Sequence, residues 1–240
     1  MGTNTRWING NLAYHDSSKK YRIFDAFGPT VCKYITDFVR MPVDDTTGDP
    51  TEFNLAIVEL GAGDTTQVLE SGVAGGVLLI TTSGNEDDGL QAQLKGEAFK
   101  LASNKPLYFG CKVKISEATQ SDLMIGLCIQ DSGPGILGAV SDGIYFRKID
   151  GTTTCNFVLE KNASETATAA WTAATTDYVT LEFYFDGTNV DFYVDGVKGT
   201  RPVTTNLCDD EELTVSFAFL NGSAQSNTCR IDWIRCIQFN

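Results

Sequence analysis

The sequence predicts an all-β protein, folded as an antiparallel two-sheet jelly-roll sandwich. The first observation is the alternation of apolar and polar residues, clearest in YVTLEFYFDGTNVDFYVDG at residues 178–196. A period of two indicates strands that bury one face and expose the other. The second is the Asp-Gly-Thr-Asn link at 186–189, because these residues tolerate the backbone of a hairpin turn. The third is that no segment carries the pattern of a long helix.

The same alternation recurs along the chain between turn signals such as Gly75-Gly76, Asp142-Gly143 and Asn221-Gly222. No period of roughly 40–50 residues repeats, which argues against a propeller. Besides the hairpin, the expected strands are residues 54–59, 76–82, 89–95, 97–101, 106–115, 122–130, 143–149, 155–161, 213–220 and 230–239.

The N-terminal segment differs from the rest of the chain. Residues 1–20 are polar and turn-rich, and they carry Trp7 and Tyr14 without alternation. We assign them to an extended N-terminal arm and residues 21–240 to the sandwich domain. Aromatic side chains in a polar arm are suited to anchoring in the pockets of a partner. The alternative is a short first strand and loop of the same domain.

The charge of the chain argues against nucleic acid as a partner. It has 31 acidic and 18 basic residues, a net charge of −13, whereas phosphate contacts need clustered Lys and Arg. No segment reaches the roughly 18 consecutive apolar residues of a membrane span, and the start lacks the layout of a signal peptide. We therefore expect that the protein is made in a cytoplasm and does not associate with a membrane.

The seven cysteines have no CxxC spacing and an odd total. Cys111 and Cys155 fall on the apolar phase of expected strands, where a free Cys acts as a small hydrophobic residue. We expect reduced thiols rather than a disulfide framework or a cysteine metal site.

Candidate catalytic and metal-binding groups are few. The single histidine, His15, is expected on the surface of the arm, away from any triad geometry. GPGILG at 133–138 matches GxGxxG, but a strand follows it instead of a helix, so we interpret it as a loop. We expect no cofactor, and only Ca²⁺ stays open, with Glu86, Asp87 and Asp88 as ligands in an irregular loop site.

Two C-terminal motifs resemble a known fold family. IDWIRCIQF resembles the closing strand of concanavalin A-like lectin/glucanase jelly rolls, and LEFYFDGTNVDFYVDGV resembles their paired strands. Glucanases of this type carry Glu-x-Asp-x-x-Glu on one strand, which aims the acid and the nucleophile at one cleft. This sequence has no such motif, so we expect a protein that is not an enzyme.

A longer resemblance is to a group of tailed-phage virion proteins built on that jelly roll. The segments that carry it include GVAGGVLLITTSGNEDDG, SDGIYFRK and TTNLCDDEELTVSFAFLNG, although Ala26 stands where the group usually has an acidic residue. The resemblance implies a capsid decoration or cement protein on the virion surface, made in the host cytoplasm. Its expected partners are the major capsid protein and its own copies, as a trimer. The expected capsid anchors are Trp7, Tyr14, Tyr21 and Phe24.

The alternative function is a carbohydrate-binding module for host attachment. Sugar binding needs exposed aromatic platforms beside polar groups. Four aromatic residues on expected strand or turn positions could supply a glycan platform: Tyr145, Trp171, Tyr184 and Tyr193.

Overall fold

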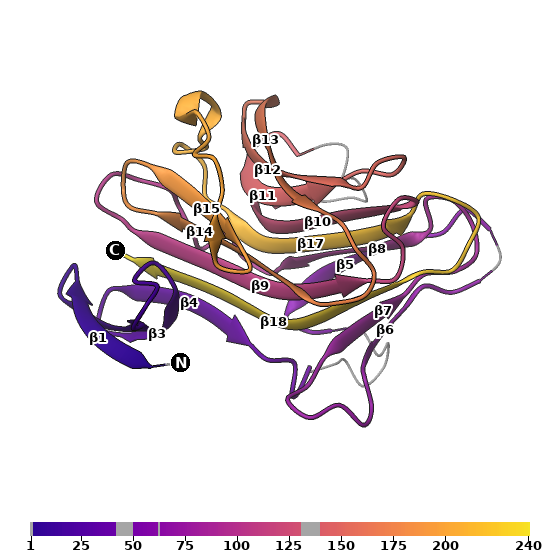
Figure 1. Cartoon of the computed structure of the whole chain (residues 1–240), viewed down its shortest axis with the longest axis horizontal. Coiled ribbons are helices and arrows are strands. Elements are labelled where there is room, and N and C mark those ends of the chain that lie inside the picture. Colours follow the sequence, from indigo (N-terminus) through magenta and orange to yellow (C-terminus); the bar gives the residue numbers. More distant parts are fainter. Residues whose placement is uncertain (1, 42–49, 62, 131–139) are drawn as a thin grey trace.

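Two antiparallel sheets pack face to face, and a small N-terminal sheet lies against one of them (Figure 1). The computed structural model describes residues 2–41, 50–61, 63–130 and 140–240, so the GxGxxG match at 133–138 lies outside the described residues. The predicted all-β sandwich is confirmed. The strands are β1 Thr3–Ile8, β2 Asn11–Asp16, β3 Ile23–Phe27, β4 Val31–Thr36, β5 Phe53–Val58, β6 Thr66–Leu69, β7 Leu78–Thr81, β8 Gly89–Leu94, β9 Leu107–Ile115, β10 Ser121–Cys128, β11 Gly143–Lys148, β12 Thr154–Lys161, β13 Ser164–Thr172, β14 Val179–Phe185, β15 Val190–Val194, β16 Val197–Lys198, β17 Thr214–Asn221 and β18 Thr228–Phe239.

One sheet has seven strands in the order β13-β12-β11-β10-β17-β8-β5. The other, an eight-stranded sheet, runs β16-β15-β14-β9-β18-β7-β6, and β4 joins it by pairing with the second half of β18. The short helix η1, Thr204–Asn206, contacts β12 and β13, and the Asn206 side-chain amide donates to the Thr166 hydroxyl at 3.0 Å. No helix among the described residues is long and apolar enough to cross a membrane.

The core lies between the two sheets and follows the predicted alternation. On β9, Leu107, Phe109 and Cys111 are buried in the main hydrophobic cluster, while Lys112 faces the other way and is only partly buried. Phe157 of the seven-stranded sheet stacks on Phe192 of the opposite sheet at 4.9 Å between ring centroids. Close aromatic packing of this kind adds to the area that the two sheets bury.

Cys111 and Cys155 are buried, as expected for thiols that act as small hydrophobic residues. Cys111 and Cys155 lie in the main core, and all seven cysteines are free thiols.

The N-terminal segment forms strands of the same domain instead of a free arm. Strands β1, β2 and β3 make one antiparallel sheet, and β3 lies beyond the expected boundary at residue 20. Its inner face, with Ala13, Ile23 and Ala26, packs on Tyr108 and Phe239 of the eight-stranded sheet. The alternation was missed because the inward positions of β2 are small or polar, so period two carries no strong apolar signal.

This docking corrects the expected solvent face of the 178–196 hairpin. Glu182 is fully buried and Tyr193 is 9% exposed, because the N-terminal sheet and the chain before β3 cover them. His15, expected on the surface, is also buried, with Nδ1 2.7 Å from the carbonyl oxygen of Asp16. The face that the alternation marked as solvent-exposed is therefore covered at Glu182 and Tyr193, and it stays partly exposed at Asp191.

Other differences are local. Strands β4, β6, β13 and β16 were not predicted, and residues 97–101 form no named strand. Asp88, which the sequence leaves open as a Ca²⁺ ligand, is buried. Its carboxylate accepts hydrogen bonds from the backbone N–H of Leu60 at 2.6 Å, from the Ser83 hydroxyl and from the Asn85 side chain at 2.9 Å. It serves as an internal cap for the loop before β8.

Candidate functional site

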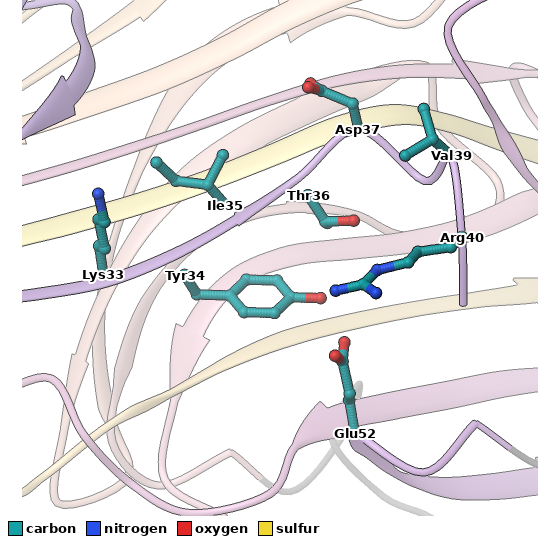
Figure 2. Close-up of a pocket in the computed structure, with 8 residues that line it drawn as sticks. All are labelled: Lys33, Tyr34, Ile35, Thr36, Asp37, Val39, Arg40 and Glu52. Atoms are coloured by element: carbon teal, nitrogen blue, oxygen red, sulfur yellow. The ribbon is translucent and has the colours of Figure 1, made fainter. Parts of the chain in front are cut away.

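A pocket of about 470 Å³ opens at the flank of the sandwich where β4 and the start of β5 meet (Figure 2). In the described residues β4 pairs only with β18, and β5 is the last strand of the seven-stranded sheet. The pocket therefore lies between two edge strands, where no neighbouring strand fills the space. Its lining residues are Lys33, Tyr34, Ile35, Thr36, Asp37, Val39, Arg40 and Glu52.

Tyr34 is the aromatic centre of this pocket. Alternation along β4 turns its ring toward the core, where it packs edge-on against Phe53 at 6.1 Å between centroids. Figure 2 shows its hydroxyl pointing toward the Arg40 guanidinium, with the Glu52 carboxylate beside it. Burial, and then the nearby Glu52 charge, raise the pKa of Tyr34, so the phenol stays protonated and able to donate.

The charges around the ring are balanced. Lys33 and Arg40 supply donors, and Asp37 and Glu52 supply acceptors. Lys33 is itself held by Asp25 of β3, with Nζ 2.6 Å from Oδ1. A pocket with an aromatic ring and both kinds of polar group can bind a polyhydroxyl ligand without demanding a net charge.

An exposed line of side chains, here called the aromatic row, lies next to the pocket. The strand register aligns Trp7 on β1, Leu12 on β2 and Phe27 on β3. Trp7 is 73% exposed and Phe27 is 55% exposed, and Tyr14 packs edge-on against Phe27 at 5.8 Å. Lys33 Nζ lies 4.4 Å from the Phe27 ring centroid, so one residue contacts the row and lines the pocket.

The four predicted anchor residues divide into two places. Trp7 and Tyr14 belong to the aromatic row. Tyr21 stacks on Tyr193 at 3.4 Å between ring centroids, which makes it part of the interface between the N-terminal sheet and the sandwich. Phe24 lies on β3 beside a register irregularity and lines a second pocket, described next.

The second pocket, here called the arginine pocket, has a volume of about 260 Å³. It lies between the N-terminal sheet and the outer face of the eight-stranded sheet. Its lining residues are Arg22, Phe24, Tyr108, Thr180, Trp233 and Arg235.

The predicted glycan platform is wrong for two of its four residues. Tyr145 is 1% exposed, and its hydroxyl donates to the Glu160 carboxylate. Tyr193 is covered by Tyr21, as described above. Both rings point outward from their sheets as alternation requires, but other parts of the chain bury them, which a periodicity argument does not detect.

The other two residues of that platform keep partial exposure. Tyr184 is partly buried, with the Arg6 guanidinium 5.9 Å from its ring centroid. Trp171 lies on the edge strand β13 and, with Thr154 and Thr172, lines a shallow pocket of about 230 Å³. The structure does not bring the four residues together in one of the pockets described here.

The centre of the seven-stranded sheet lacks a carboxylate pair on its outer face. Among the described residues of β10 and β17, this face presents Met124, Cys128, Ser216 and Ala218, and its one carboxylate is Asp122, at the end of β10 opposite Leu220. Glycoside hydrolysis by two carboxylates needs both groups in the same cleft, on either side of the bond that is cleaved. The expectation that the protein is not an enzyme stays a prediction.

One group of potential metal ligands occurs in the described residues. Oxygen or sulfur atoms of Asp142, Cys208 and Asp210 lie within 4.8 Å of one another. Asp210 also lies 3.2 Å from Lys161, and Asp142 accepts a hydrogen bond from the backbone N–H of Asn162 at 2.9 Å. Residues 86–88, which the sequence leaves open as Ca²⁺ ligands, are not part of this group, and Asp88 already accepts hydrogen bonds from the Leu60 N–H and the Asn85 side chain.

The sequence matches no family model and no curated protein. The fold is similar to an endo-1,3-beta-glucanase from Streptomyces sioyaensis, at 12% identity and a TM-score of 0.58, over 90% of this chain and 100% of that one. It is similar to the Emp46p carbohydrate recognition domain, at 10% identity and a TM-score of 0.57, over 84% of this chain and 94% of that one. Peanut lectin gives 10% identity and a TM-score of 0.57, over 87% of this chain and 97% of that one. The chain therefore has the concanavalin A-like lectin/glucanase fold.

Proposed function

We propose that the protein is a non-enzymatic carbohydrate-binding protein and that the pocket between β4 and β5 is its ligand site. The observation that carries this proposal is the combination of Tyr34 with Arg40 and Glu52 in one open pocket (Figure 2). The aromatic row beside it offers flat apolar surface for the C–H faces of further sugar rings.

Size and chemistry support a small oligosaccharide. The volume of about 470 Å³ lies within the range of roughly 300–1,000 Å³ that is typical of small-molecule sites. The similar lectin and carbohydrate recognition domain share the fold, which supports the same class of ligand for this chain. Host attachment through such a ligand is the biological role that we propose.

A glycan array followed by calorimetric titration of the hits tests the proposal. Arg40→Ala and Glu52→Gln should each weaken binding about tenfold, since each removes a charged hydrogen-bonding group. Arg201→Ala is the matched control, because Arg201 follows β16 at the opposite edge of the same sheet. A wild-type protein that binds no glycan, or variants that bind as well as the control, would refute the proposal.

A second candidate function is a structural role on a phage capsid, and the exposure of Trp7 and Phe27 favours it. Two large apolar side chains exposed on one sheet face resemble the anchor of a protein interface. Residues 1–20 are part of a folded sheet, so point variants test this better than a deletion. Trp7→Ser with Phe27→Ser should reduce occupancy on purified heads, and unchanged occupancy would exclude the row as anchor. The capsid partner, the trimer and the virion location remain predictions.

A further inference from the structure

The arginine pocket carries cationic groups that the proposed sugar site does not use. Arg22 forms one wall, but its guanidinium is already paired, because Nε donates to Glu182 at 2.6 Å and Nη2 donates to the same carboxylate. Arg235 forms the opposite side, with its guanidinium carbon 4.9 Å from the ring centroid of Trp233. Of the two arginines, Arg235 is the one with capacity for a ligand.

Arg235 has a buried donor without an acceptor. Within the described part of the chain, its Nε makes no hydrogen bond, although the atom is buried. Its only ion pair there is a long one, from Nη2 to Asp37 at 3.5 Å. The buried Nε is out of reach of a ligand, so the Nη end of the guanidinium, whose one ion pair among the described residues is this long one, is the part that can pair with a carboxylate. The chemistry at this position fits a ligand carboxylate.

The two pockets are neighbours across a single residue pair. Asp37 lines the sugar pocket and contacts Arg235, which lines the arginine pocket. Strand register supports this, since Arg235 on β18 pairs directly with Ile35 on β4. Tyr34 faces the core side of β4 and Arg235 lies on the outer face of the sheet, so an oligosaccharide that spans both pockets passes around the strand at Asp37.

We infer that the arginine pocket is an acidic subsite, so that the ligand is an oligosaccharide containing a uronic acid. This inference rests on the proposed function and deepens it. The uronate carboxylate accepts from Arg235, and the hydroxyl of Thr180 and the rings of Phe24 and Trp233 contact the sugar ring. The volume of about 260 Å³ is enough for one such ring.

Titration calorimetry with two matched probes tests the inference: α-1,4-galactotriose and α-1,4-trigalacturonate, which differ only at C6. The wild type should prefer the acidic probe by about tenfold or more, and the preference should fall as salt rises. Arg235→Gln should abolish the preference, because affinity for the acidic probe falls much more than affinity for the neutral probe. Arg235→Lys keeps the charge without the fork, so it should reduce the preference partly. Arg201→Gln is the control and should bind both probes as the wild type does.

The outcomes separate the two proposals. Binding of the neutral probe without any preference for the acidic one overturns the acidic subsite and leaves carbohydrate binding intact. A preference that persists in Arg235→Gln, at unchanged melting temperature, also overturns the subsite. If the Gln variant does not fold, an unchanged preference in Arg235→Lys overturns it instead. Failure of the wild type to bind either probe overturns the subsite, and a blank glycan array overturns carbohydrate binding as well.

Discussion

Glu182 is expected to hold the N-terminal sheet on the sandwich. Its fully buried carboxylate accepts from Arg22 Nε at 2.6 Å, from Arg22 Nη2, from the Tyr108 hydroxyl at 2.8 Å and from the Tyr21 hydroxyl at 3.3 Å. Glu182→Gln leaves the Arg22 charge buried without its partner. Breaking a buried ion pair from one side costs about 3–5 kcal/mol. Asp16, 3.8 Å from Arg22, stays in place, so we expect the lower end, about 3 kcal/mol.

Urea and thermal unfolding measure this loss. For a chain of this size, about 3 kcal/mol corresponds to a melting temperature lowered by about 6–12 °C. Hydrogen exchange should accelerate most in β1, β2 and β3, because their attachment is what the variant weakens. Replacing both Arg22 and Glu182 by Met should recover part of the loss, since no unpaired charge remains between them and Asp16 keeps its hydrogen bonds from Ser18.

The matched control is Glu165→Gln, which removes an exposed pair. Glu165 accepts from Arg147 at 2.7 Å, but its side chain is 44% exposed, so the expected loss is below about 1 kcal/mol. If Glu182→Gln loses no more than this control, or if exchange in the N-terminal sheet is unchanged, the carboxylate does not hold the sheet and the reasoning fails.

Three further predictions concern stability. Burial raises the pKa of Asp122 to about 6, so the native state holds a proton that the unfolded chain releases, and stability falls as pH rises from about 4 to 6. Asp122→Asn should remove about 2 kcal/mol of that fall, measured by urea unfolding at pH 4 and pH 7. Asp88→Ala should cost about 3 kcal/mol in urea unfolding, because it leaves the Leu60 N–H and other buried donors unpaired. Phe157→Ala should cost about 3–5 kcal/mol, since it opens a cavity against Phe192, and a melting temperature near that of the wild type would contradict this.

The central strands could be predicted because large apolar residues mark one face of each. Strand β14 begins and ends within a residue of the expected positions, β15 begins at the expected residue and ends two residues early, and β9 has the predicted inner face. Edge strands were missed where that signal is weak. Strand β13, SETATAAWT, has small Thr and Ala residues in place of large side chains, and only Ala170 and Trp171 of it pack against the core.

The candidate site was beyond sequence reasoning for a different reason. Tyr34, Arg40 and Glu52 belong to a stretch without clear alternation, and they meet only because β4 and β5 close the same flank of two different sheets. Likewise, Glu182 sits in a regular solvent-face pattern, and its burial depends on a sheet more than 150 residues earlier in the chain. Periodicity identifies the faces of a strand, but it does not say what covers them.

The long strand β18 also affects how the protein is made. It lies between β9 on one side and β7 followed by β4 on the other, so these three strands complete their pairing only when residues 228–239 are present. During synthesis, the edges of β4, β7 and β9 that will pair with β18 stay unpaired until the last part of this sequence is made. Late, long-range pairing of this kind slows folding and exposes strand edges to aggregation. Chaperone binding to the nascent chain should therefore persist until β18 emerges from the exit tunnel.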